Sequence, residues 1–175
     1  MDRLSIITDE FGNQVVLIPD IISKNKQNID WSEVEEYLKQ FVGEIISIAD
    51  TEDVVYLGKE FPEEFTGSKY TGSAKGARAK AKANAVQGIR EMVEIATDKT
   101  FRENHKAKHN IDAANGWYYY TTRFAIPIYR NNDKLDEYNV YSGCLVVNCN
   151  SNGKMFLYDL VDIKKEASNP LKTSK

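Results

Sequence analysis

The feature that most constrains the fold is a succession of three β-type runs in the last third of the chain. They cover Trp117–Tyr129, Tyr138–Cys149 and Lys154–Ile163, and Asn152-Gly153 supplies a tight turn between the last two. Strands that follow one another through short turns pair antiparallel. Because the helical patterns all come earlier, we expect an α+β fold in which an N-terminal hairpin and helices precede an antiparallel meander of three to four strands.

The region before these strands contains two helical patterns and two hairpin patterns. Asp30 with Glu33 forms a capping-box arrangement that predicts a helix start, and Gly43 predicts its end. An Ala-rich segment from Ser73 to about Thr97 predicts one long helix, and polar residues 98–115 predict a broken second one. Hairpins are expected over Leu4–Thr8 with Gln14–Ile18 and over Glu44–Ala49 with Asp53–Leu57.

Composition divides the chain into three parts. Residues 23–27 are polar, so we expect an N-terminal hairpin appendage over 1–27 and the main α+β domain over 28–166. Polar residues 167–175 are expected to form a flexible tail. No apolar run approaches the length of a membrane span or of a signal-peptide core. We therefore expect a cytoplasmic protein with no membrane partner.

Charge is unevenly distributed along the chain, although the net charge is only −3. Residues 1–65 hold 5 Lys and Arg against 15 Asp and Glu, whereas residues 66–130 hold 12 against 5. A basic segment of this kind favours a polyanion such as nucleic acid as the partner. The alternative is that the two segments pack together and neutralise each other, and the counts leave both interpretations open.

The basic segment begins with a glycine-rich stretch, Thr66–Ser73. It lacks the Gly-Lys-Ser/Thr ending that binds phosphate and magnesium in nucleotide triphosphatases, which disfavours that class of enzyme. Lys69, together with a Ser73 cap at the start of the following helix, would still suit one phosphate group. An ordinary capped turn explains the same residues.

Three cations near the start of the Ala-rich helix need an explanation. On a helical wheel, Lys75, Arg78 and Lys82 lie almost on the apolar side. Burying unpaired cations is costly, so we expect these three to overhang the sheet or to line an open concavity where nucleic acid binds. If the helix starts later or is broken at a glycine, they are simply solvated.

The two histidines of the chain, His105 and His109, are four residues apart and would share one face of a helix. Lys106 and Lys108 lie between them and disfavour a metal cation, and the two cysteines alone make no zinc site. We therefore expect no metal and no cofactor. His109 suits proton abstraction from a ribose 2′-hydroxyl. A polar surface helix with two ordinary histidines is the alternative.

Alternation along the first strand of the meander separates two faces. Tyr118, Tyr120 and Phe124 are expected to face the core. An aromatic and cationic row on the other face would suit stacking on unpaired bases, with a guanidinium for phosphate. The same face would equally fit a strand that is covered by the N-terminal hairpin. Its residues are Trp117, Tyr119, Thr121 and Arg123.

Six short motifs follow one another in a characteristic order. They are Asp30-Trp31-Ser32-Glu33, Tyr56-Leu57-Gly58, Thr66-Gly67-Ser68-Lys69-Tyr70, Glu103-Asn104-His105-Lys106-Ala107-Lys108-His109, Gly116-Trp117-Tyr118 and Leu157-Tyr158-Asp159-Leu160. Over about residues 28–166, this succession resembles domains of the large polyvalent proteins of phages and conjugative elements. Those domains are grouped with the barnase/EndoU/colicin/RelE-like fold, which is used mainly by metal-independent ribonucleases.

The resemblance implies a mobile-element protein that acts in the cytoplasm of a bacterial host. Catalytic residues vary within that fold, so the candidates here rest on chemistry and are His109, Arg123, Thr121 and Tyr119. We expect binding of RNA or another polyanion, and metal-independent RNA cleavage is left open. The alternative is a non-catalytic protein that binds a bacterial host protein through its acidic N-terminal half. The nucleic-acid-binding candidates are Lys69, Ser73, Lys75, Arg78, Lys82, His105, Lys106, Lys108 and Trp117.

Overall fold

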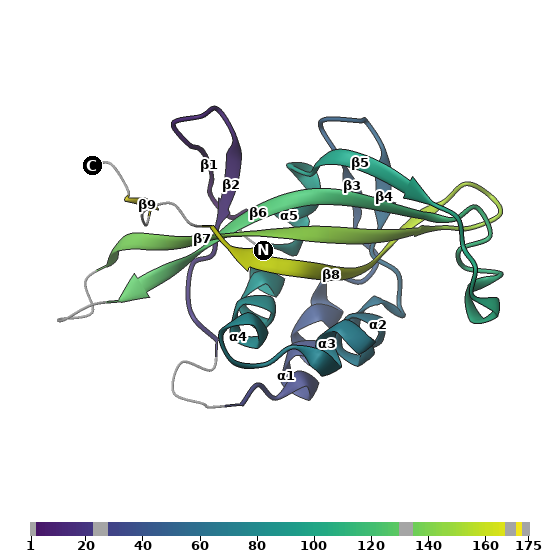
Figure 1. Ribbon diagram of the computed structural model, residues 1–175, viewed down its shortest axis with the longest axis horizontal. Helices are drawn as coiled ribbons and strands as arrows, with labels where there is room; N and C mark the ends of the chain where they lie inside the picture. The colour runs from purple at the N-terminus through teal and green to yellow at the C-terminus, as the bar shows by residue number, and fades with distance from the viewer. Residues whose placement is uncertain (1–2, 23–27, 130–134, 167–170, 173–175) are drawn as a thin grey trace.

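Three long strands form the middle of one sheet in the computed structural model, which describes residues 3–22, 28–129, 135–166 and 171–172 (Figure 1). Strand β7 pairs antiparallel with both of its long neighbours, as the turn pattern predicts. Together with the helices that precede these strands, this confirms the α+β class. The three strands are β6 (Trp117–Tyr129), β7 (Leu135–Cys149) and β8 (Met155–Lys165).

The sheet is larger and more mixed than a meander of three to four strands. In the described residues, two hairpins extend it to the order β1-β2-β6-β7-β8-β4-β3. Strand β2 joins β6 in parallel, and β4 joins β8 in parallel. The expectation fell short here because a hairpin pattern shows local pairing only and carries no sign of where the hairpin docks. The strands are β1 (Ile6–Thr8), β2 (Gln14–Leu17), β3 (Ile45–Ser47) and β4 (Val54–Tyr56).

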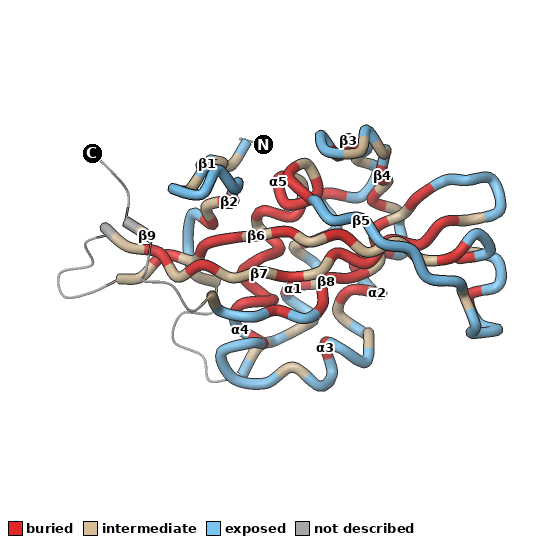
Figure 2. Tube along the Cα trace, turned by 45° about the horizontal axis from the view of Figure 1, so that its top comes forward, coloured by how far each residue is buried: buried red, intermediate tan, exposed pale blue. Residues whose placement is uncertain are grey.

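Strand β5 (Thr97–Arg102) stands where a broken second helix was predicted, so that prediction is wrong. It pairs antiparallel with the first half of β6 and contains an irregularity at Asp98, where φ is 56°. All six of its residues are exposed (Figure 2), so the strand lacks the apolar alternation that identifies a half-buried one. A short strand, β9 (Leu171–Lys172), pairs with β7.

Helices α1 to α4 lie together on one side of the long strands (Figure 1). Helix α1 (Trp31–Leu38) begins at the predicted cap, where the Asp30 carboxylate accepts a hydrogen bond of 3.0 Å from the Ser32 amide. A 3-10 turn, η1 (Lys39–Phe41), follows α1. Helix α2 (Phe61–Gly67) packs beside α1 and against β8.

The predicted long helix is interrupted, although its apolar stripe of Ala81, Ala85, Ile89 and Met92 is buried as expected. One break lies at Gly88, where a Cβ would lie 2.9 Å from a methyl carbon of Val16 in β2. Glycine therefore lets β2 approach the helical segment closely. The pieces are α3 (Lys69–Ser73), α4 (Gly76–Ala85), the 3-10 turn η2 (Val86–Gly88) and α5 (Ile89–Glu94).

A single cluster of buried side chains joins the N-terminal hairpin, the helices and the sheet. It contains Val16 and Ile18 together with Phe65, Ile89 and Leu160. The hairpin thus contributes to the core of the main domain, while the predicted boundary at residues 23–27 lies outside the described residues. Of the predicted tail, residues 167–170 and 173–175 also lie outside them. No described helix is both long enough and apolar enough to cross a membrane.

Candidate functional site

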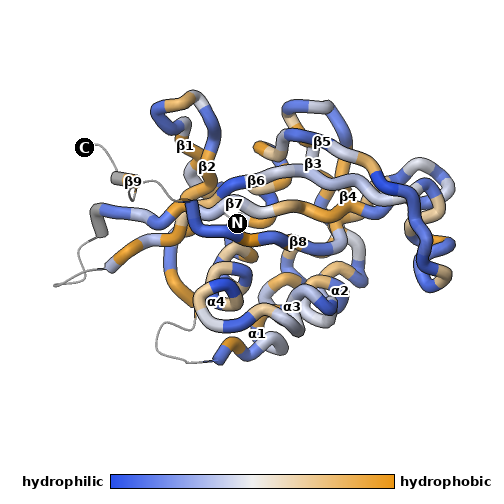
Figure 3. The backbone as a smooth tube through the Cα atoms, viewed as in Figure 1, coloured by the Kyte–Doolittle hydropathy of each residue, from blue (hydrophilic) through white to orange (hydrophobic). Residues whose placement is uncertain are grey.

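A cleft of about 720 Å³ lies where α2 and α3 approach the segment that connects β5 to β6. Its lining comes from those helices, from residues 102–109 and from all three long strands. The connecting segment, residues 103–116, is strongly hydrophilic (Figure 3) and contains a 3-10 turn, η3 (Ala107–His109). The cleft brings together seven of the residues that the sequence pointed to. They are Lys69, His105, Lys106, Lys108, His109, Trp117 and Tyr119.

The connecting segment is held in place by local polar contacts and by one glycine. The Asn104 side chain donates to the Lys106 carbonyl at 3.0 Å and accepts from the Trp117 indole at 3.3 Å. Gly116 has a φ of 90°, and a Cβ at this position would lie 2.5 Å from a ring carbon of Phe101. The return into β6 therefore requires glycine, and it places Lys106 and Trp117 on the same cleft.

His109 is held by a carboxylate and by two aromatic rings. Its Nδ1 lies 2.9 Å from Asp112 Oδ2, a geometry in which Nδ1–H donates to the carboxylate and Nε2 is left for another partner. The ring is 4.9 Å from the Trp117 ring and 5.6 Å from the Tyr158 ring, edge to face in both cases. Although His109 is only 8% exposed, it lines the cleft. An imidazole that is held in one orientation in this way is suited to general-base chemistry.

Positive charge collects along one part of the cleft. The neighbouring charge of Lys69, followed by partial desolvation and the charge of Lys108, lowers the pKa of Lys106. Among the described residues, none of these three lysines forms an ion pair. Arg102 lies over the Tyr119 ring, with 5.0 Å between the guanidinium carbon and the ring centroid. An anion in the cleft would relieve the mutual repulsion of the lysines.

Negative charge lines another part of the cleft and comes from α2. Glu60 and Glu63 are exposed, whereas Glu64 is partly buried. Burial, followed by the negative charge of Asp112, raises the pKa of Glu64 to about 7. A carboxyl group that holds its proton near neutral pH can donate it during a reaction. The cleft therefore contains a fixed imidazole, a carboxyl group with a raised pKa and a cluster of cations.

Lys82 corrects the expectation that the first cations of the Ala-rich helix face solvent. It is 2% exposed, and its Nζ lies 2.8 Å from Oδ1 of the fully buried Asp159. Burial lowers the pKa of the Lys82 ammonium and raises that of the Asp159 carboxyl. The Ser68 hydroxyl donates to Asp159 at 2.6 Å and accepts from the Thr71 amide, so Ser68 caps α3. Ser73 was predicted to cap the Ala-rich helix, but it is the last residue of α3, and Lys75 is the N-cap of α4. The buried Lys82–Asp159 pair, through the Ser68 bond to Asp159, therefore holds in place helix α3, which carries Lys69.

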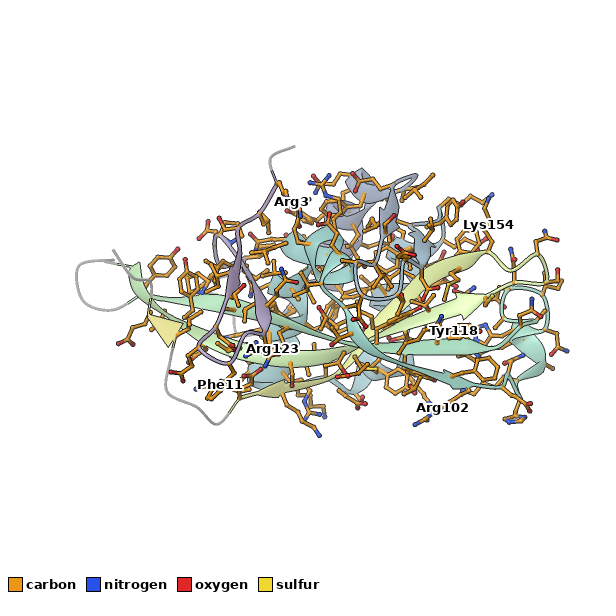
Figure 4. The ribbon with its side chains drawn as sticks, turned by 90° about the horizontal axis from the view of Figure 1, so that it is seen from above. Arg3, Phe11, Arg102, Tyr118, Arg123 and Lys154 are labelled. Carbon is orange, nitrogen blue, oxygen red and sulfur yellow. The ribbon has the colours of Figure 1, made fainter. Side chains whose placement is uncertain are left out.

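The other predicted site residues lie outside the cleft. Ser73, Lys75 and Arg78 are exposed on α3 and α4, and Thr121 is half-buried within β6. Arg123 contacts Glu166 at 2.8 Å and Asp9 of the N-terminal hairpin at 2.8 Å. Figure 4 shows it next to the hairpin tip, well away from Arg102. Its guanidinium is therefore engaged by two carboxylates.

Four residues that line the cleft or contact its lining were not predicted from the sequence. Asp112 follows His109 by three residues, a helical spacing that could have suggested the pair. Arg102 reaches the cleft through a strand that was predicted as helix. Tyr158 and Glu64 come from β8 and α2, and only the tertiary fold brings these two to the cleft. For them the sequence offers no local signal.

Comparison with protein-family models, with curated proteins and with solved structures gave no match to this chain. Within the described residues, no group of three or more His, Cys, Asp or Glu side chains is arranged to hold a metal ion.

Proposed function

We propose that the cleft binds single-stranded RNA and cleaves it without a metal ion. The observation that carries the proposal is the Asp112-oriented His109, which lies in one cleft with Lys69, Lys106 and Lys108. A fixed imidazole beside several cations matches the needs of phosphodiester cleavage at a 2′-hydroxyl. The motif order, which resembles mobile-element domains with a ribonuclease-like fold, supports the same class of substrate and a bacterial host cell.

Binding would use cations for the backbone and aromatic rings for the bases. A phosphate between Lys69 and Lys106 would reduce the repulsion that lowers the pKa of Lys106. Tyr119, with Arg102 against its ring, offers a stacking surface for an unpaired base. Unpaired RNA fits better than a duplex, because bases must be free to reach an aromatic side chain within the cleft.

Cleavage would proceed by attack of the ribose 2′-oxygen on its adjacent phosphorus. His109 Nε2 takes the 2′-hydroxyl proton, and the bond from phosphorus to the 5′-oxygen breaks. The departing 5′-oxygen receives a proton from the Glu64 carboxyl, whose pKa of about 7 keeps it partly protonated at neutral pH. Lysine ammonium groups stabilise the charge that develops on the phosphate oxygens. The products are a 2′,3′-cyclic phosphate and a free 5′-hydroxyl.

The decisive experiment is incubation of the purified protein with RNA in excess chelator, with DNA of the same sequence as a control. Cleavage of RNA alone is expected to survive chelation. His109→Ala should reduce the rate by about 10² to 10⁴. His105→Ala is the matched histidine variant, and at saturating RNA it should retain most of the rate because His105 has no part in the proposed proton transfers. RNA binding without cleavage by the wild-type protein would remove the catalytic part of the proposal.

The acidic residues of α2 favour a second candidate, a non-catalytic contact with a bacterial host protein. Glu60 and Glu63 are exposed at the cleft, and a dense negative surface can occupy a site built for nucleic acid. Capture from a nuclease-treated bacterial lysate tests this candidate. A specific partner should be lost with the double variant Glu60→Gln/Glu63→Gln. Retention of every captured protein by that variant would reject the acidic surface as the contact.

A further inference from the structure

Two lysine side chains of the cleft lie next to each other without a paired carboxylate. Lys69 comes from α3 and Lys106 from the segment that connects β5 to β6, and their ammonium groups are within hydrogen-bonding reach of each other. Both residues are exposed at the cleft, so a ligand can reach them. Neither forms an ion pair within the described residues. Because two like charges repel, an anion between them would be stabilised by both.

The backbone that carries each lysine is held by hydrogen bonds. The Asn104 side chain donates to the Lys106 carbonyl at 3.0 Å and accepts from the Lys106 amide at 3.2 Å. Ser68 directly precedes Lys69, caps α3 and donates its hydroxyl to the buried Asp159 at 2.6 Å. The two charges are therefore brought together by the surrounding fold, which positions them before a ligand arrives.

The carboxyl groups of the cleft lie apart from this lysine pair. The positive charges of Lys69 and Lys108 act on Lys106, whereas the charges that act on Glu64 are those of carboxyl groups. Glu103 also lines the cleft but forms no ion pair within the described residues. An RNA strand that ran on across the cleft would bring its phosphates against the acidic residues of α2. A strand that ends at the lysines avoids that repulsion.

The number of charges also distinguishes a terminal phosphate from one within a strand. A phosphodiester carries one negative charge, whereas a phosphomonoester carries about −1.5 to −2 near pH 7 and presents three acceptor oxygens. Each lysine ammonium group has three donors and no acceptor. With Lys108 close to Lys106, this part of the cleft offers more positive charge and more donors than one phosphodiester can use.

We propose that Lys69 and Lys106 hold the terminal phosphate of an RNA strand, so that the cleft prefers strands that end in a phosphomonoester. The inference rests on the proposed RNA binding and names the kind of RNA that is bound. A 5′-phosphate and a 3′-phosphate present the same chemistry, and the experiment separates the two. The terminal phosphate sets the position of the strand, and the scissile phosphodiester lies further along it, at His109.

The test compares strands of one ten-nucleotide RNA sequence that differ only at their ends. Every ribose carries a 2′-O-methyl group, which blocks attack by the 2′-oxygen, so that binding alone is measured. Each unlabelled strand competes with one fluorescent RNA for the wild-type protein, and fluorescence anisotropy follows the competition. A phosphate at the 5′ or the 3′ end should tighten binding about tenfold over the strand with two hydroxyl ends. The end that gives this gain identifies the source of the phosphate.

A methyl ester on the favoured terminal phosphate is the matched control for charge. The ester keeps the phosphate group but leaves it with the single negative charge of a phosphodiester. The esterified strand should bind within about twofold of the strand with two hydroxyl ends. Equal gains from the free and the esterified phosphate would mean that the cleft holds a phosphodiester as well as a terminal phosphate, and would overturn the inference.

Variants then locate the preference at the lysine pair. Lys69→Gln and Lys106→Gln should each remove most of the tenfold gain, and both residues are exposed, so we expect the variants to fold. Lys80→Gln, exposed on α4 outside the cleft, should keep the gain. No gain from either terminal phosphate, or a gain that survives in both cleft variants, would overturn the inference and leave RNA binding intact. Absence of binding to every strand would overturn the proposed function itself.

Discussion

Lysine serves two opposite purposes in neighbouring parts of this molecule. Lys82 of α4 is buried with its ammonium against Asp159 of β8, whereas Lys69 and Lys106 are exposed at the cleft and close to each other. The first charge is neutralised by a carboxylate of the same chain, whereas the other two form no ion pair within the described residues. The amino-acid composition does not distinguish these lysines. The partner of each ammonium group does distinguish a lysine that stabilises the fold from one that is available at the cleft.

The largest expected effect comes from breaking the buried pair. Lys82→Ala leaves the Asp159 carboxylate buried without its counter-ion and should lower the free energy of unfolding by about 3–5 kcal/mol in urea denaturation. Lys80→Ala, on the exposed side of the same helix, is the control and should change it by less than about 0.5 kcal/mol. A change of that small size for Lys82→Ala would mean that the pair does not hold α3 in place.

Salt dependence should separate the cleft cations from the other cations of the basic segment. With about four phosphate contacts, a fourfold rise in salt should weaken RNA binding about fiftyfold. The triple variant Lys69→Gln/Lys106→Gln/Lys108→Gln should reduce that factor to about threefold. The matched triple variant Lys75→Gln/Arg78→Gln/Lys80→Gln lies on α4 outside the cleft and should keep the wild-type salt dependence. Equal flattening by both triple variants would place binding on the whole basic segment.

Stacking should contribute affinity that does not depend on salt. Tyr119→Ala is expected to weaken RNA binding about tenfold at every salt concentration, because a stacked base releases no counter-ions. Phe11→Ala removes an aromatic ring that is 79% exposed on the N-terminal hairpin and should leave affinity unchanged. Titrations of both variants at two salt concentrations would check this. A reduced salt dependence in Tyr119→Ala would mean that the variant also displaces Arg102.

The smallest expected effect is a pH-dependent loss of stability at Glu64. Its pKa in the folded protein is raised to about 7, so the folded state holds this proton at pH values where the unfolded chain releases it. The folded protein should therefore lose stability as pH rises from about 4.5 to 7. Solvent screening of the partly exposed side chain limits the effect to about 1 kcal/mol. Glu64→Gln should remove this pH dependence and be the more stable protein at pH 8.

Unfolding curves of the wild type and of Glu64→Gln at pH 5 and pH 8 would measure this pH dependence of stability. Glu63→Gln, on the exposed side of α2, is the control and should change stability by less than about 0.5 kcal/mol at either pH. A pH dependence that persists in Glu64→Gln would assign the titration to another group.

The elements with strong local signals could be predicted from sequence, and their long-range arrangement could not. Asp30 marks the start of α1, and the Asn152-Gly153 turn joins β7 to β8, because caps and tight turns depend on a few adjacent residues. Strand β5 was misread because it is exposed on both faces and carries no periodicity. The parallel docking of β2 and β4 depends on partners far away in sequence.

The same distinction applies to the candidate site. His109, Lys69 and the Trp117 strand were predicted from residue type, and the cleft does bring them together. Lys82 was predicted as a surface cation because its partner, Asp159, lies far along the chain in β8. Glu64 drew no attention because its carboxyl becomes unusual only when the fold buries it near Asp112.

The parallel pairing of the two hairpins has a consequence for biosynthesis. Val16 of β2 pairs opposite Phe124 of β6, and Val55 of β4 pairs opposite Met155 of β8. Each hairpin therefore cannot join the sheet until a strand about a hundred residues further along the chain has been synthesised. At about 5–20 residues per second, that delay is on the order of 5–20 s on the ribosome. During this time the apolar sides of β2 and β4 have no sheet to join. Because the first 65 residues hold 15 Asp and Glu against 5 Lys and Arg, we expect charge repulsion to oppose association of emerging chains before β6 and β8 are made.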